Sequence, residues 1–221
     1  MTERKIVDYA ALKIRHRAER GGYPQELSLR VHRALSWLDR AERSTDDPDV
    51  QFILLWVAFN SAYAQDVEAS PVASERTRLM EFLAHLCRVD KKQYDDLLWS
   101  EFSGSIRVLL DNPDVFQPHW DWRNGRVSEE AYLARFATAR SVAEKALATQ
   151  STYTLLEIVL LRLYTLRNQL VHGGATWRGE TNRDQVRDGV SILCRLVPLV
   201  ISTLMNHPDD DWGPVHYPVV D

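Results

Sequence analysis

Cysteine is scarce in this sequence: Cys87 and Cys194 are the only two among 221 residues. They form no C-x-x-C pair, so the sequence contains neither a disulfide framework nor a zinc-binding cysteine motif. Each lies in an apolar pattern of helical period, which predicts two buried, reduced thiols. Reduced thiols are typical of cytosolic proteins, and we expect a cytoplasmic protein.

Long uninterrupted apolar runs are also missing. Of the two most apolar stretches, residues 52–58 are too few to cross a bilayer, and residues 155–166 carry Glu157 and Arg162. The first residues, MTERKIVDYAALK, contain no apolar segment of the signal-peptide type. We therefore expect no membrane partner.

The motifs of several enzyme classes do not occur in the chain. It has no HExxH and no clustered Cys/His pair, and its last two histidines, His207 and His216, lie in a Pro-rich tail. It has no P-loop and no GxGxxG, which argues against nucleotide hydrolysis and dinucleotide binding. We expect no metal and no cofactor.

The charge balance gives no global reason to bind a polyanion, since the net charge is −4 and the pI is near 6.0. Its distribution is uneven, however. Residues 1–43 hold ten basic against six acidic side chains, whereas the rest of the chain holds 17 against 25. This basic segment is either the solvated faces of two amphipathic helices or a groove that meets a partner.

Alternating strand patterns are rare, and apolar residues recur with helical period, so we predict an all-α protein. Gly21-Gly22-Tyr23-Pro24 separates the first two expected helices. Asp47 is an N-cap candidate followed by Pro48 at the first helical position, and opens a central helix. Ser128 and Asn182 are N-cap candidates further along, and Pro198 predicts a kink. The expected helices cover about 2–19, 25–43, 48–66, 75–88, 129–148 and 183–206, with one more from residue 151 or 152 to the segment 167–174 and short ones within 90–125.

No linker or change in composition is strong enough to divide the chain, which predicts one domain over residues 1–221. Residues 1–45 form an N-terminal helical extension, residues 90–127 an insertion of short helices and loop, and residues 208–221 a C-terminal arm. The insertion contains an aromatic, Pro-containing loop that either stacks bases or covers the core. Its aromatic side chains are Phe116, His119, Trp120 and Trp122.

The segment RNQLVHGG, residues 167–174, ends the longest apolar helix. Tyr164, Asn168 and His172 are spaced four apart and share one ridge, so Asn168 can hydrogen-bond to the imidazole and orient it. Arg167 lies in line with leucines, and a buried arginine needs a partner. That partner is either an acid of the same fold, with His172 a simple helix cap, or the phosphate of a ligand.

Arg and His five residues apart occur often by chance in a chain with seven histidines, whereas Asn directly after the Arg makes the pattern rarer. In this form RNQLVHGG resembles the R-x4-6-H signature of HEPN domains, a helical family. Upstream, QFILLWVAFNSAY resembles the W-x-A-F-N-x-x-Y helix of the Apea-like HEPN proteins. The matching positions are Trp56, Ala58, Phe59, Asn60 and Tyr63.

The resemblance implies an α-helical HEPN bundle that forms a homodimer, in which two RNxxxH motifs meet across the two-fold axis. Many members are metal-independent endoribonucleases of toxin–antitoxin or antiviral defence systems, controlled by an antitoxin or regulatory protein. Others are catalytically silent modules that bind partners or nucleotides. For an RNA-cleaving member, Arg167, Asn168 and His172 would be catalytic, with weaker substrate contacts from Tyr164, Gly173, Gly174, Asn60 and Tyr63.

The chemistry of the histidine and arginine side chains agrees with these catalytic roles. Imidazoles titrate near neutral pH and exchange protons with a ribose 2′-OH or a 5′-leaving oxygen, and an arginine stabilises charge on a phosphorane-like transition state. Asn168 would fix the imidazole tautomer or contact the phosphate. Gly173 and Gly174 either let RNA approach closely or simply cap the helix.

Overall fold

The computed structural model describes residues 8–64, 75–101, 106, 109–180, 182–215 and 217, and throughout this part the chain forms helices without a β-strand. The all-α prediction is therefore confirmed. Packing divides the chain into two compact units: unit 1 comprises residues 1–91 and 190–221, and unit 2 comprises residues 92–189. The prediction of one domain with an insertion at 90–127 stays a prediction.

Unit 1 begins with two helices joined by a tight turn, as the sequence predicts. Helix α1 spans Tyr9–Glu19, the 3₁₀ turn η1 spans Arg20–Gly22, and α2 spans Gln25–Glu42. Asp8 caps α1 by accepting a 2.9 Å hydrogen bond from the Ala11 amide. The first seven residues of the expected helix 2–19 lie outside the described part of the chain.

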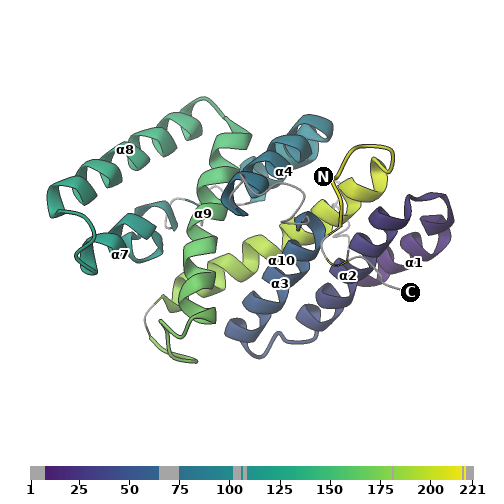
Figure 1. The fold of residues 1–221 in the computed structure, drawn as a ribbon, viewed down its shortest axis with the longest axis horizontal. Coiled ribbons are helices and arrows are strands. Elements are labelled where there is room, and N and C mark those ends of the chain that lie inside the picture. Colours follow the sequence, from purple (N-terminus) through teal and green to yellow (C-terminus); the bar gives the residue numbers. More distant parts are fainter. Residues whose placement is uncertain are drawn as a thin grey trace. The chain divides into compact units, whose positions relative to one another are not determined.

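Helix α3, Pro48–Tyr63, is the centre of unit 1 and lies beside α2 (Figure 1). Asp47 caps it by accepting hydrogen bonds from the amides of Asp49 and Val50, so the predicted cap and the Pro48 start are confirmed. Both faces of the helix are apolar, and Trp56 and Phe59 are at most 1% exposed. Burial on both faces explains why this helix lacks an amphipathic stripe.

Unit 1 also contains α4, Glu75–Val89, and the larger part of α10, Arg183–Asn206. Helix α10 runs through Pro198 without interruption, and the predicted kink there stays a prediction. By length and composition α10 is long and apolar enough to cross a membrane. Most of its apolar window is buried within the chain, as in the core helix of a soluble protein, so this criterion alone is weak evidence for a membrane span.

A buried arginine fixes the C-terminal segment of unit 1. Arg30 is 1% exposed, and its Nη1 donates to the carbonyl oxygens of Ala62 and Ala64 at 2.8 and 3.1 Å. Its Nη2 donates to the carbonyls of Trp212 and Gly213 at 3.2 and 3.0 Å. The guanidinium thus satisfies the end of α3 and holds the described start of the predicted arm against unit 1.

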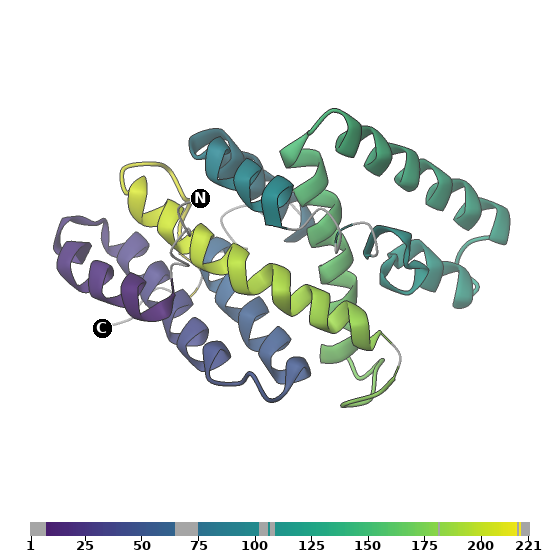
Figure 2. The same cartoon turned by 180° about the vertical axis from the view of Figure 1, so that it is seen from behind.

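Unit 2 contains α7, Gln117–Arg123, α8, Glu129–Ala148, and α9, Thr152–Val171. Shorter elements precede them: α5, Lys91–Asp96, which begins at the unit boundary, the π-helical turn η2, Leu97–Glu101, and the 3₁₀ turn η3, Pro113–Val115. Ser128 caps α8 by accepting from the Ala131 amide at 3.2 Å, as predicted. Figure 2 shows α7 and α8 side by side in this unit.

The aromatic segment predicted as a loop is helical, and that prediction is wrong in this respect. Asn112 caps η3 by accepting from the Asp114 amide, and Pro113 stands in the first turn, where no amide is needed. Pro118 occupies the same kind of position in α7. The prolines therefore start two short helices instead of excluding them.

The aromatic side chains of this segment pack against α8. The rings of Trp122 and Tyr132 stack with centroids 5.1 Å apart and planes within 4°. His119 makes edge contacts with both rings at 5.5 and 5.3 Å, and Phe116 meets Phe136 at 5.6 Å. These contacts agree with the alternative in which the aromatic segment covers the core, because its rings pack against α8.

Candidate functional site

Helix α9 carries the RNQLVHGG motif at its C-terminal end, where its burial changes. Leu155, Leu160, Leu163 and Leu166 are at most 1% exposed. From Arg167 to Leu170 the residues are half-buried, and His172 is exposed. The motif is therefore the accessible end of an otherwise buried helix.

The start of α9 is held by polar contacts within unit 2. The indole Nε1 of Trp99 donates to Thr152 Oγ1 at 2.9 Å, and the same hydroxyl donates to Asp95. The Ser151 hydroxyl donates to Thr154 Oγ1 at 2.9 Å. Residues of α5 and η2 thus fix one end of the helix whose other end carries the motif.

Helix α9 ends through a glycine in the left-handed conformation. The His172 amide donates to the Asn168 carbonyl at 3.0 Å, and Gly173 follows with φ +72°. The amides of Gly174 and Ala175 then return to the Gln169 carbonyl at 2.7 and 3.1 Å. This is the C-cap predicted as one of the two roles for the glycine pair, and the approach of RNA stays a prediction.

Arg167 contacts two other motif residues. Its Nη1 donates to Asn168 Oδ1 at 2.9 Å, and its Cζ lies 5.8 Å from the centroid of the Tyr164 ring. No hydrogen bond joins the Asn168 side chain to the His172 ring in the described residues, so the predicted orientation of the imidazole by Asn168 is not seen. The asparagine instead positions the guanidinium.

The leucine stripe in line with Arg167 is buried as predicted, but Arg167 at its end is only half-buried, and the arginine in the core is Arg162. The Arg162 side chain is 4% exposed, donates to the Leu110 carbonyl at 3.3 Å, and has its Cζ 4.2 Å from the Phe116 ring centroid. Burial lowers its pKa to about 10. The LLRLY context was the sequence signal: a single charge among core leucines.

Gln169 is a motif residue whose role the sequence did not reveal. Its Nε2 donates to the Asp114 carbonyl at 2.6 Å, and its Oε1 accepts from Asn182 Nδ2 at 2.8 Å. The glutamine therefore links α9, η3 and the residue preceding α10, and it fixes both ends of the loop after His172. Asn182, predicted as a cap, uses its amide group in this link.

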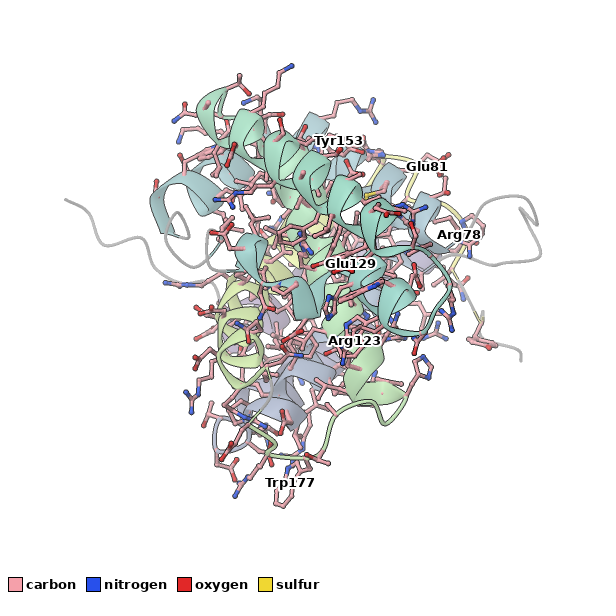
Figure 3. All side chains as sticks on the ribbon, turned by 90° about the vertical axis from the view of Figure 1, so that its left-hand side faces the viewer. Arg78, Glu81, Arg123, Glu129, Tyr153 and Trp177 are labelled. Carbon is pink, nitrogen blue, oxygen red and sulfur yellow. The ribbon has the colours of Figure 1, made fainter. Side chains whose placement is uncertain are left out.

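The loop between Gly173 and Asn182 exposes a large aromatic side chain. Trp177 is 66% exposed and is labelled at the lower edge of Figure 3, where its side chain points away from the ribbon. The Cζ of Arg178 lies 4.6 Å from its ring centroid. Arg183 donates to the Gly179 carbonyl at 3.0 Å. An exposed Trp next to arginines suits the stacking of an unpaired base.

Asn60 and Tyr63 of the second motif belong to unit 1, whereas Arg167, Asn168 and His172 belong to unit 2. Tyr63 is 4% exposed, and its ring packs between Phe59 and Phe82 at centroid distances of 5.2 and 6.0 Å. Asn60 is half-buried, and its Oδ1 has no hydrogen-bond partner within the described residues. Their contact with substrate stays a prediction.

Within the part of the chain that the structure describes, no three His, Cys, Asp or Glu side chains gather as metal ligands would. The candidate site consists of Arg167, Asn168, Tyr164 and the exposed His172.

Comparisons with protein-family models, with curated proteins and with solved structures found no match to this chain.

Proposed function

We propose that this protein is a metal-independent endoribonuclease of the HEPN type, in which Arg167 and His172 act on the scissile phosphate and Asn168 positions Arg167. The observation that supports the proposal most is the position of these residues at the accessible end of a buried helix. A rigid, buried helix holds catalytic groups more precisely than a loop does. The order and spacing of the two short motifs add to this support.

The reaction needs only groups that the chain supplies. The His172 imidazole removes the proton from a ribose 2′-OH, and the 2′-oxygen forms a bond to phosphorus. The bond from phosphorus to the 5′-oxygen breaks, and a second imidazole donates a proton to that oxygen. The products carry a 2′,3′-cyclic phosphate and a 5′-hydroxyl, and DNA is not cleaved because it lacks the nucleophile.

Arg167 stabilises the negative charge that grows on the phosphoryl oxygens in the transition state. Its bond to Asn168 and its position against the Tyr164 ring restrict the guanidinium before substrate binds. Asn168 and Tyr164 act through Arg167 and are positioning residues. Gly173 gives the turn after His172 its left-handed conformation and leaves open space there.

The second imidazole comes from a second copy of the chain, so the proposed enzyme is a homodimer. In this arrangement each motif is half of a site, with one His172 as base and the other as acid. The proposed biological setting is a toxin or antiviral defence effector in the cytoplasm, controlled by an antitoxin or regulatory protein.

A second candidate is a catalytically silent HEPN module that dimerises and docks a partner protein or a nucleotide. The observation that favours it is electrostatic. Between residues 157 and 188 the chain has five arginines against four acids, which gives little attraction for an RNA backbone.

The decisive experiment incubates purified protein with total RNA in EDTA, beside the variants His172→Ala and Arg167→Ala. The control is His207→Ala, which removes a histidine outside the motif whose hydrogen bonds are made by its backbone. We expect cleavage by the wild type and the control, with 2′,3′-cyclic phosphate ends, and a strongly reduced rate in the two motif variants. Cleavage that needs Mg²⁺, or that keeps the wild-type rate in both motif variants, contradicts the proposal. Folded, dimeric wild type without cleavage favours the silent module.

A further inference from the structure

An open cavity of about 520 Å³ lies at the surface of unit 1, between α1, the η1 turn and the start of α2, and several of its lining residues, Arg20 and His32 among them, are exposed. Its lining includes Arg20, His16 and His32, and no lining residue is acidic. A cavity of this size accommodates a small organic molecule. It belongs to the basic segment of the chain, residues 1–43, for which the proposed ribonuclease mechanism has no use.

The basic side chains at this cavity lie close to one another. The Nζ atom of Lys13 is 3.4 Å from Nδ1 of His32, and the His32 ring stacks on the His16 ring with centroids 6.5 Å apart. Burial, and then the positive charges of Arg17 and Arg20, lower the pKa of Lys13. An anion in the cavity would remove this mutual repulsion.

The pKa values of both histidines shift in the same direction. Burial and the charge of Lys13 lower the pKa of His16. Burial and the charges of Lys13, Arg20 and Arg33 lower the pKa of His32. Burial is the larger cause of both shifts, and the smaller contributions of the neighbouring basic groups have the sign expected for a positive electrostatic potential at the cavity.

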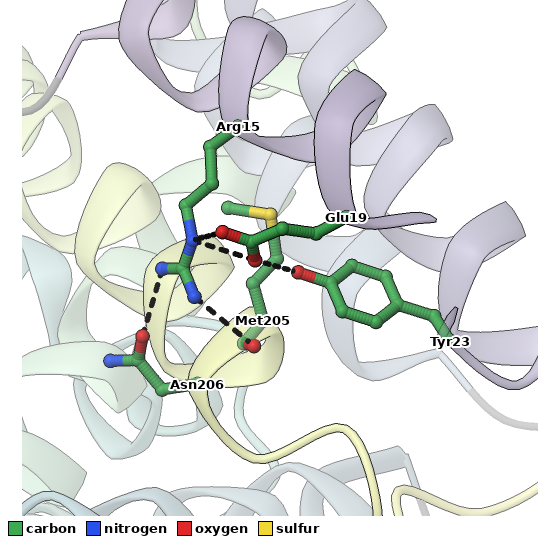
Figure 4. A network of polar contacts seen from close by, with 5 residues as sticks. All are labelled: Arg15, Glu19, Tyr23, Met205 and Asn206. Carbon is green, nitrogen blue, oxygen red and sulfur yellow. Dashed lines mark hydrogen bonds and ion pairs between the residues drawn. The ribbon is translucent and has the colours of Figure 1, made fainter. Parts of the chain in front are cut away.

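The acids of the region do not neutralise this charge. Glu19 accepts hydrogen bonds from Arg15 Nε and from the Tyr23 hydroxyl, as Figure 4 shows. Arg15 also donates to Asn206 Oδ1 at 2.8 Å and to the Met205 carbonyl at 3.3 Å. Glu19 is therefore engaged by Arg15.

Two further acids are near enough to act on basic groups of α1 and α2. Asp39 raises the pKa of Lys13, but its effect is smaller than those of burial, Arg17 and Arg20. Burial lowers the pKa of Arg30, and the charge of Glu26 raises it by a smaller amount. Arg30 faces the end of α3 and the C-terminal segment. Neither acid lines the cavity.

Polar groups without hydrogen-bond partners add a second reason for a ligand. Pro24 is the N-cap of the 18-residue helix α2, and no side chain caps this helix within the described residues, which leaves its first amides without intrahelical acceptors. Gln25 and Ser28 of this first turn line the cavity. His16, another lining residue, is 1% exposed; its Nε2 is 3.3 Å from Ser28 Oγ, and its Nδ1 has no partner in the described chain.

We propose that this cavity binds a small molecule carrying a phosphate monoester, with the phosphate between Arg20, His32 and the first turn of α2. The positive end of a helix and a nearby arginine fork are groups that favour phosphate. Tyr23 and Leu29 line the same cavity and provide apolar surface for the rest of the molecule. This site is separate from the RNQLVHGG motif and does not depend on the proposed nuclease activity.

The test uses the full-length protein and three probes: inorganic phosphate, AMP as a phosphate monoester, and adenosine as its counterpart without phosphate. Binding is followed by calorimetry, and the pKa of His32 by NMR titration of its C2 proton. We expect AMP to bind at millimolar concentration or below and to raise the pKa of His32, because a nearby anion stabilises the imidazolium. Adenosine should do neither.

Arg20→Gln and His32→Gln should each weaken AMP binding about tenfold, the order expected for one charge-assisted hydrogen bond. The matched control is Arg40→Gln, which removes the same charge from the exposed far part of α2. Inorganic phosphate that binds as tightly as AMP identifies the free anion as the ligand, whereas weaker binding identifies the ester. Adenosine binding equal to AMP, no saturable AMP binding, or equal losses in Arg40→Gln and Arg20→Gln overturn the proposal.

Discussion

Arg167 donates a 2.9 Å hydrogen bond from Nη1 to Oδ1 of Asn168, the next residue of α9. Successive residues on a helix point about 100° apart, so this bond bends the guanidinium around the helix toward the ridge that ends at His172. In the proposed enzyme the pair gives the asparagine directly after the arginine a positioning role. Its amide holds the arginine, and the imidazole stays exposed.

The first prediction follows from this pair. If Asn168 acts only through Arg167, then Asn168→Ala lowers the RNA cleavage rate, and the double variant with Arg167→Ala is no slower than Arg167→Ala alone. The measurement is the single-turnover rate of all four proteins at saturating RNA. Losses that simply add would show that Asn168 contacts substrate independently of the arginine.

The second prediction concerns the turn after His172. Gly173 has φ +72°, where a side chain is strained even though the space around it is open. We expect Gly173→Ala to reduce the free energy of unfolding by about 1 kcal/mol. The control is Gly22→Ala, at a glycine with equally open surroundings and no positive φ. Equal urea midpoints for the two variants would contradict the expected backbone strain of an alanine at position 173.

The third prediction separates the two roles of Arg162, its packing and its charge. Arg162→Ala removes the donor to the Leu110 carbonyl, as Arg162→Met also does, but it leaves a cavity against Phe116 as well and should cost about 3 kcal/mol of unfolding free energy. Arg162→Met keeps most of the volume and removes a buried charge, so we expect it within about 1 kcal/mol of wild type. Both values come from urea unfolding curves. A methionine variant as unstable as the alanine variant would show that the charge itself is required.

The helices could be predicted from the sequence because their signals are local. Asp47 with Pro48, and Ser128 with its helix, are caps that need only a few neighbouring residues to act. The segment at Pro113 and Pro118 was harder, because a proline both ends helices and begins them. Which of these it does depends on the packing of the surrounding aromatic side chains, and packing is not local.

Which residues form the candidate site stays a prediction, and their contacts could not be predicted from helical spacing. Helical spacing placed Tyr164, Asn168 and His172 on one ridge, but it could not show that Asn168 would bond to Arg167. The burial of Arg162 in place of Arg167 depends on Phe116 and Phe136, which are far away in the sequence. The cavity at His16 and Arg20 depends likewise on how α1 turns back onto α2.

The fourth prediction is a pH dependence of the C-terminal segment. Asp210 Oδ2 lies 2.7 Å from His85 Nε2, and this hydrogen bond lowers the pKa of Asp210 below its ordinary 3.8. Because the folded pKa is depressed, the carboxylate contributes stability above pH 3.8 and loses it as the pH falls through the lower folded value. The carboxylate is partly exposed, so solvent screening keeps the contribution below about 1 kcal/mol.

Asp210→Asn should therefore be less stable than wild type at pH 5, and the difference should vanish toward pH 2. The Trp212 ring, stacked 4.4 Å from His85, provides a fluorescence signal for this segment in urea titrations at each pH. Asp209→Asn is the control, since it removes the same charge from the neighbouring exposed residue. A constant difference between Asp210→Asn and wild type across this pH range would mean that the asparagine changes packing, because a lost packing contact does not depend on the ionisation of Asp210.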